Sequence, residues 1–195
     1  MAVPPPLPYT GRMIDKLALR AQLRAERDAF AIEASEAILA PEAFVARLRP
    51  DMIVATYVAI GSEADPTQLA AAAAEKGCTL ALPFVVDRAA PIRFLAWQMG
   101  EPLVEGPFSL RQPHETSPEV APDVILTPLV GFDARLNRLG QGAAHYDRAF
   151  ARYPDAWRVG VAWAMQQVPA IPSEIWDVPL QAVITEEGMT WHAEA

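Results

Sequence analysis

Cysteine is almost absent from this chain of 195 residues, which contains Cys78 alone. A single cysteine excludes an internal disulfide and a metal site built from several cysteines, and it fits a reducing compartment. Cys78 stands directly before the apolar run 79–82, so we expect it to be a buried structural thiol.

An excess of positive charge is also missing. The chain has 16 Lys and Arg residues against 24 Asp and Glu residues, which gives a net charge of −8. A general binder of nucleic acid or of anionic membranes needs a basic surface, so we expect neither partner. A few arginines in a cleft can still bind a small anion.

Long hydrophobic runs are missing as well. No uninterrupted apolar stretch reaches about 18 residues, so we expect no membrane-spanning helix. Residues 1–12 are rich in proline and lack the regions of a signal peptide, which predicts a flexible leader before a single domain over 13–195. The expected location is the cytoplasm, and the expected oligomeric state is a monomer or a weak dimer.

The chain does have the composition and the pattern of a folded α/β domain. Its hydrophobic fraction is 52% and its charged fraction 21%, which suffices for a core. Near-continuous apolar runs, typical of strands buried on both faces, alternate with helical segments. Strands are predicted at 52–60, 79–86, 92–97, 124–129, 157–163 and 182–185. Helices are predicted at about 15–37, 41–50, 66–77 and 146–152. This alternation favours an α/β layered fold with a mostly parallel sheet.

A polar loop after the fourth predicted strand is the most informative stretch. It contains Asp133, Arg135 and Arg138, and then Gly140 and Gly142 precede a helix. Ligands of open α/β sheets bind at the carboxyl ends of strands, where glycine amides and a helix N-terminus attract anions. The glycine spacing matches neither the P-loop nor the dinucleotide fingerprint. From these residues alone, an anion site and a tight loop with a capping glycine both remain open.

The same stretch resembles the signature of the 5-formyltetrahydrofolate cyclo-ligase family. The matching residues are Gly131-Phe132-Asp133, Asn137-Arg138-Leu139-Gly140, Gly142 and Tyr146-Asp147-Arg148. Further segments resemble the family in the same order along the chain, from about residue 14 to 188: Lys16 with Arg20, Ser62-Glu63-Ala64-Asp65, 100–109 with Gly106-Pro107-Phe108, and Trp176-Asp177-Val178-Pro179-Leu180 followed by 183–186.

This resemblance implies an enzyme that uses ATP and Mg²⁺ to cyclise 5-formyltetrahydrofolate to 5,10-methenyltetrahydrofolate, with release of ADP and phosphate. It also implies a three-layer, Rossmann-like α/β/α sandwich similar to the NagB/RpiA/CoA-transferase-like fold. In such a reaction the γ-phosphoryl group moves to the formyl oxygen, N10 attacks the formyl carbon, and phosphate leaves. We therefore expect the protein mainly to position the substrates and to stabilise phosphoryl charge.

The resemblance also implies roles for individual residues. The expected ATP-binding residues are Lys16, Arg20, Arg138, Leu139, Gly140, Gln141, Gly142, Ala143, Ala144, His145 and Tyr146. The expected substrate-binding residues are Val58, Glu63, His145 and Tyr146. Asp147 and Asp177 are expected to bind magnesium, and Arg138 and Tyr146 to be catalytic. Each charge has an ordinary alternative, such as a solvated helix face or a cap, and Phe108 is expected either to stack on adenine or to belong to the core.

The chain departs from the family pattern in the glycine loop. Gln141 replaces a residue that is usually Arg, Tyr or another large side chain, Ala143 and Ala144 replace Gly-Gly or Lys-Gly, and His145 replaces a tyrosine. Alanine disfavours positive φ by roughly 1 kcal/mol but is harmless within a helix. The lost loop cation leads us to expect that Gln141→Arg raises the affinity for ATP.

Three functional hypotheses follow. The first is an active cyclo-ligase, supported by the retained Lys16, Arg20, Arg138, Asp147 and Asp177. The second is a diverged, non-catalytic paralogue that binds folate or a nucleotide, supported by the altered loop. The third is an isomerase or a CoA-transferase-like enzyme, which rests on fold analogy alone.

Overall fold

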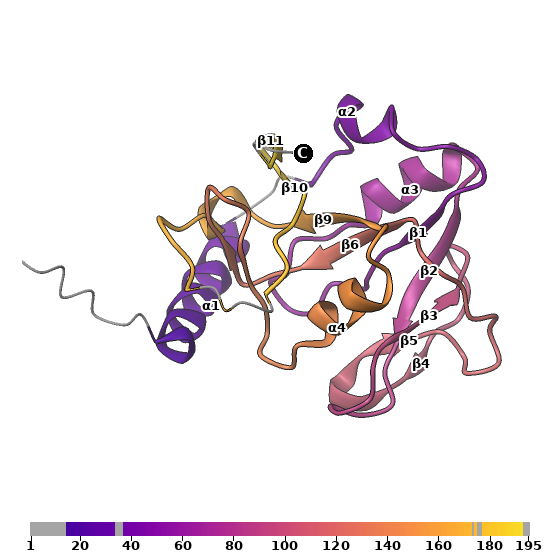
Figure 1. Ribbon diagram of the computed structural model, residues 1–195, viewed down its shortest axis with the longest axis horizontal. Coiled ribbons are helices and arrows are strands. Elements are labelled where there is room, and N and C mark those ends of the chain that lie inside the picture. The colour runs from indigo at the N-terminus through magenta and orange to yellow at the C-terminus, as the bar shows by residue number, and fades with distance from the viewer. Residues whose placement is uncertain (1–14, 34–36, 173, 175–176, 193–195) are drawn as a thin grey trace, which may run out of the picture.

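A computed structural model describes residues 15–33, 37–172, 174 and 177–192 of the chain. The expected leader at 1–12 and Trp176 of the family-like segment lie outside the described residues. The central element is a seven-stranded sheet in the order β11-β10-β9-β6-β1-β2-β3 (Figure 1). Its strands are β1 Ile53–Ala55, β2 Thr79–Phe84, β3 Arg93–Ala96, β6 Val124–Pro128, β9 Trp157–Val161, β10 Ala182–Thr185 and β11 Gly188–Trp191.

The strands inside the sheet run parallel, and both edges are antiparallel. β10, β9, β6, β1 and β2 pair in parallel, whereas β3 and β11 run against their neighbours. Two small hairpins lie outside this sheet: β4 Val104–Glu105 with β5 Arg111–Gln112, and β7 Gly131–Phe132 with β8 Arg138–Leu139. The prediction of a mostly parallel sheet is confirmed.

Helices cover both faces of the sheet. Successive residues of a strand point to opposite sides, so apolar side chains on both faces need a covering layer. On β6, Val124 and Leu126 join one core cluster, and Ile125 joins the other. The first cluster includes Leu69 of α3 (Thr67–Glu75) together with Phe44 of α2 (Glu42–Val45). The second includes Ala149 and Phe150 of α4 (His145–Arg152). The predicted three-layer α/β/α arrangement is therefore confirmed.

The first helix, α1 (Lys16–Glu33), packs beside the small β7–β8 hairpin. Asp15 caps it by accepting a hydrogen bond from the Leu17 N–H at 2.8 Å. Leu23 forms a third cluster with Val130, Leu139 and Ile171. This packing places the polar face of α1 against the loop that follows β8.

Several expected boundaries are wrong. The strand predicted at 52–60 is a strand only over Ile53–Ala55, and Thr56 N–H still donates to Ala81 O before the chain leaves the sheet. The apolar run continues to residue 60 because Tyr57 and Val58 line a cavity rather than a strand pair. Val58 therefore follows β1 instead of lying on it. The second predicted helix ends at Val45, not near residue 50.

The expectation that Cys78 is buried is confirmed, and its thiol donates to Arg49 O at 3.2 Å. Trp163 is buried, whereas Trp97 and Trp157 are partly buried against the first core cluster. Among the described residues, no helix has both the length and the apolar character needed to cross a bilayer.

Candidate active site

A cavity of about 660 Å³ opens where β1, β2 and β6 end. Every residue that the sequence assigned to a site contributes to its wall: Lys16, Arg20, Val58, Glu63, Arg138, Leu139, Gly140, Gln141, Gly142, Ala143, Ala144, His145, Tyr146, Asp147 and Asp177. These residues come from α1, from the loop after β1, from the segment between β8 and α4, and from the chain before β10. The structure thus brings together residues that are up to 161 positions apart. Their roles stay predictions.

One side of the cavity, which we call the cationic half, contains Lys16, Arg20, Arg24 and Arg138 together with the loop 139–144. Lys16 Nζ lies 2.9 Å from Asp177 Oδ2, and Arg138 pairs with Asp147. The Arg138 side chain is only 6% exposed, and its Nε has no hydrogen-bond partner among the described residues. A guanidinium with so little exposure is weakly screened by water, so it interacts strongly with a charge brought next to it.

The two expected magnesium ligands therefore lie in the same cavity, each beside a cation. Burial pushes the pKa of Asp177 upward, but hydrogen bonds from the Glu174 N–H and the Lys16 ammonium hold that pKa below its ordinary value. Arg138 adds to this effect, so its charge is felt at both carboxylates. No group of three or more His, Cys, Asp and Glu side chains with a metal-binding arrangement occurs within the described part of the chain.

The loop between β8 and α4 is shaped by left-handed backbone conformations. Gly142 has φ +100° and Ala144 has φ +53°. Ala144 directly precedes α4, so the alanines of this loop lie outside the helix. They would be harmless only within a helix, and that condition is not met. Ala144 accordingly carries the steric cost of a Cβ at positive φ, on the order of 1–2 kcal/mol.

The loop is held to α1 by two successive arginine contacts. Arg20 Nε donates to Gly140 O at 2.8 Å. Arg24 Nε donates to the Gln141 side-chain oxygen at 3.1 Å. The structure thus places the guanidinium of Arg24 beside position 141, where the family usually has a large or basic residue. Gln141→Arg would bring two guanidinium groups together. Their repulsion opposes the rise in ATP affinity that we expect from the sequence.

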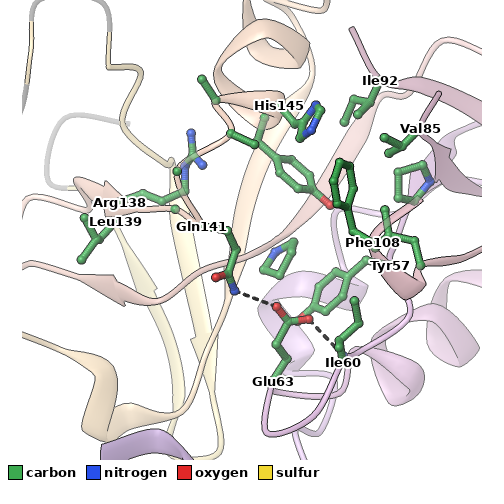
Figure 2. A pocket seen from close by; sticks show the side chains of 18 of the residues that line it. Tyr57, Ile60, Glu63, Val85, Ile92, Phe108, Arg138, Leu139, Gln141 and His145 are labelled. Atoms are coloured by element: carbon green, nitrogen blue, oxygen red, sulfur yellow. Dashed lines mark hydrogen bonds between the residues drawn. The ribbon is translucent and has the colours of Figure 1, made fainter. Parts of the chain in front are cut away.

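The opposite side of the cavity, which we call the aromatic half, is lined by apolar side chains: Tyr57, Val58, Val85, Ile92, Phe108 and Leu110. Figure 2 shows Arg138 and Leu139 on one side, the rings of Tyr57 and Phe108 on the other, and Glu63 and Gln141 pointing toward one another below. Phe108 is 57% exposed, so the alternative that it belongs to the core is wrong. Whether it stacks on adenine stays a prediction.

Glu63 is the acidic group of the aromatic half. Its Oε2 accepts the Ile60 N–H at 3.1 Å, and its Oε1 accepts from the Gln141 amide nitrogen at 3.0 Å (Figure 2). Burial raises the pKa of Glu63, although these hydrogen bonds and the nearby Arg27 and Arg24 oppose the increase. The carboxylate is thus oriented at both oxygens and is easier to protonate than an ordinary glutamate.

His145 and Tyr146 begin α4 between the two halves. Burial lowers the pKa of His145, and the positive charges of Arg148 and Arg88 lower it further, so the imidazole is neutral at neutral pH. Burial and the charge of Glu63 raise the pKa of Tyr146. The phenol therefore keeps its proton at neutral pH and can donate a hydrogen bond to a bound substrate.

Sequence reasoning assigned no role to Arg24 or Arg27, although both line the cavity. Their positions carry a signal, because Lys16, Arg20 and Arg24 recur every four residues and Arg27 follows three later. Arg27 is buried, and its Nε donates to Ser62 Oγ at 2.9 Å. It lies close enough to Glu63 to act on the pKa of that carboxyl.

Comparison with known proteins places this geometry in a family. The model of the 5-formyltetrahydrofolate cyclo-ligase family matches residues 12–186. The 5-formyltetrahydrofolate cyclo-ligase of Escherichia coli (strain K12) is 32% identical over 139 residues, which cover 68% of this chain and 76% of that protein. The enzyme of the same name from Haemophilus influenzae is 38% identical over 93 residues, which cover 45% of this chain and half of that relative.

Solved structures agree with the sequence comparisons. The 5,10-methenyltetrahydrofolate synthetase of Aquifex aeolicus has a TM-score of 0.73 and 28% identity, with 92% of this chain and 94% of that chain covered. The synthetase of Mycoplasma pneumoniae, at 21% identity and a TM-score of 0.62, supports the fold alone. The expectation of a ligase family is confirmed. Since the family model spans almost the whole chain and the fold matches that of a methenyltetrahydrofolate synthetase, this protein belongs to the 5-formyltetrahydrofolate cyclo-ligase family.

Proposed function

We propose that this protein catalyses the ATP- and Mg²⁺-dependent cyclisation of 5-formyltetrahydrofolate to 5,10-methenyltetrahydrofolate, with release of ADP and phosphate. The observation that carries the proposal is that one cavity of about 660 Å³ joins a cationic half to an aromatic half. Cations and loop amides suit a triphosphate, and aromatic and aliphatic side chains suit a reduced pteridine. Binding both in one cavity brings the γ-phosphoryl group next to the formyl oxygen.

The reaction needs the formyl oxygen to become a leaving group. Transfer of the γ-phosphoryl group to that oxygen breaks the bond to the β-phosphate and releases ADP. The lone pair of N10 then attacks the formyl carbon and N10 loses its proton. The C–O bond breaks as phosphate leaves with the oxygen, and the phosphate takes up the proton released from N10. Arg138, Lys16 and Arg20 neutralise the phosphoryl charge, and Tyr146 donates a hydrogen bond from its neutral phenol at the junction of the halves.

The carboxylates of Asp147 and Asp177 fit a magnesium ion that is bound mainly by phosphate. Mg²⁺ commonly takes one or two carboxylates and completes its octahedron with water and phosphate oxygens. Both carboxylates face the cavity that holds the cations, and each side chain is 26% exposed. In the complex, Mg²⁺ would neutralise phosphate charge. Lys16 and Arg138, now paired with these carboxylates, would turn to the phosphates.

The folate is expected to lie in the aromatic half. Val58 packs against its ring, and Glu63, oriented by Ile60 and Gln141, accepts hydrogen bonds from the polar edge of the pteridine. His145 stands beside Tyr146 as a neutral imidazole. A carboxylate held in this way suits the donor-rich edge of a pterin better than a phosphate, which it would repel.

The assay is formation of the methenyl chromophore from 5-formyltetrahydrofolate, ATP and Mg²⁺. We expect turnover that depends on all three components and that is lost in Asp147→Ala, measured as absorbance against time. Asp155→Ala is a matched control, because Asp155 is an exposed aspartate outside the cavity wall. Absence of turnover in the unaltered protein would contradict the proposal.

The second candidate is a non-catalytic folate- or nucleotide-binding protein of the same family. The observation that favours it is the strained loop, with Ala144 at φ +53° and no cationic side chain of its own at position 141. Binding of 5-formyltetrahydrofolate that needs no ATP, together with no chromophore, would support this candidate over the enzyme.

A further inference from the structure

The side chain of Gln141 links the two halves of the cavity. Its oxygen accepts a hydrogen bond from Arg24 Nε at 3.1 Å, and its nitrogen donates one to Glu63 Oε1 at 3.0 Å. We propose that Gln141 is a positioning residue that couples nucleotide binding in the cationic half to folate binding in the aromatic half. This inference deepens the proposed function and rests on it for the identity of the two ligands.

A carboxamide meets both demands of this position. Arg24 offers donors alone, and an ionised Glu63 offers acceptors alone, whereas glutamine has one acceptor group and one donor group in a single plane. The amide orientation follows from its partners, because a flipped amide would oppose donor to donor and acceptor to acceptor. Arginine at 141 would pair with Glu63 but repel Arg24, and glutamate would pair with Arg24 but repel Glu63.

The bridge has a further hydrogen-bonded contact on each side. On the folate side, the Ile60 N–H holds the second oxygen of Glu63 at 3.1 Å, so the carboxylate has little freedom once Gln141 binds its first oxygen. On the nucleotide side, α1 contacts the loop at Gly140 through Arg20 and at Gln141 through Arg24. Phosphates that draw Arg20 and Arg24 toward them must therefore move or tighten position 141, and Glu63 with it.

The coupling is measurable by equilibrium binding. The affinity for 5-formyltetrahydrofolate is determined by calorimetry with and without a non-hydrolysable ATP analogue and Mg²⁺. We expect the analogue to raise folate affinity by about fivefold or more, the range common for coupled sites, and the folate to raise analogue affinity by the same factor. In Gln141→Leu, which keeps the size but not the hydrogen bonds, we expect the factor to fall close to one.

Gln22→Leu is the matched control. Gln22 is an exposed residue of α1 whose amide nitrogen donates to Glu26 at 2.9 Å, and it does not line the cavity. The same substitution there should leave the coupling factor unchanged. A coupling factor that stays at the unaltered protein's value in Gln141→Leu, or one that is absent in the unaltered protein, would overturn the inference.

A ligand-free measurement separates this inference from the proposed function. Gln141 hydrogen-bonds the ionised form of Glu63, so its removal should raise the pKa of Glu63 further, as followed by a carboxyl NMR titration. Gln141→Glu, which keeps the partner of Arg24 but repels Glu63, should raise that pKa as well. An unchanged pKa in both folded variants would refute the bridge. Missing turnover with intact coupling would instead refute the proposed reaction alone.

Discussion

The two halves of the cavity are built on different principles. In the cationic half, the charges already have partners, since Lys16 pairs with Asp177 and Arg138 with Asp147. In the aromatic half, Phe108 leaves 57% of its surface exposed, and most of the wall is apolar apart from Glu63, Arg88 and Arg111. A ligand of the cationic half must exchange ion pairs, whereas a ring entering the aromatic half only covers open surface. We therefore expect the first half to govern the chemical step and the second to govern folate affinity.

The largest expected effect comes from Arg138→Ala. Its guanidinium is nearly buried, and under the proposed function it stabilises the developing phosphoryl charge, so its removal should lower kcat by about 100- to 1,000-fold, as for other charge-stabilising groups. The measurement is kcat from chromophore formation at saturating folate and ATP. Arg135→Ala is the control, because Arg135 is exposed on the same hairpin and lies outside the cavity wall. An effect on KM alone would contradict the expectation that the cationic half governs the chemical step.

An intermediate effect is expected from Glu63→Gln. Loss of a charge-assisted hydrogen bond, worth about 1.5–3 kcal/mol, should raise the KM for folate by roughly 10- to 100-fold with little change in kcat. Glu26→Gln, an exposed substitution on α1, serves as the control. A fall in kcat with unchanged KM would assign Glu63 to the chemical step instead.

The pH dependence of the KM tests the same residue. Because burial raises the pKa of Glu63, the carboxylate begins to gain a proton at a higher pH than an ordinary glutamate does. As the pH falls through that pKa, the ionised acceptor disappears, so the folate KM should rise. Glu63→Gln should remove this pH dependence, and its persistence would place the titrating group elsewhere.

The smallest expected effect concerns the loop between the halves. Ala144→Gly removes a Cβ from a residue at φ +53°, which relieves about 1–2 kcal/mol of strain, but glycine also loosens the unfolded chain by about 0.4–1 kcal/mol. We expect a net gain of up to about 1 kcal/mol in the free energy of unfolding, measured by urea denaturation. Ala143→Gly, whose φ is not positive, should instead lose stability. Equal effects of both substitutions would show that Ala144 is not strained.

Local pattern predicted the sheet better than it predicted the ends of the strands. The apolar runs located β2, β3, β6, β9 and β10 because burial on both faces demands continuous hydrophobicity over several residues. The strand predicted from the run 52–60 was too long, since residues that line a cavity can be as apolar as those of a strand. The hairpins β4–β5 and β7–β8 were not predicted, because each of their strands has only two residues and shows no alternation of apolar and polar side chains.

The site shows the same division. Its residues from 138 to 147 could be identified because they are consecutive and resemble a family signature, and Lys16 and Arg20 could be joined because one helix carries both. Arg24 was passed over because its partner, Gln141, lies 117 residues away. No local pattern contains such a pair, and the substitution at position 141 could not be interpreted without it.

The amino-acid sequence by itself determined the alternation of strands and helices, the family and a set of candidate site residues, because hydrophobic period and motif spacing are properties of neighbouring residues. Tertiary structure alone decided which charges meet. The hydrogen bonds of Lys16 with Asp177, of Arg24 with Gln141 and of Gln141 with Glu63 form only when α1 packs on the β7–β8 hairpin and the strand ends converge. Electrostatic and hydrogen-bond energies depend on distances in space, which the order of residues along a chain does not contain.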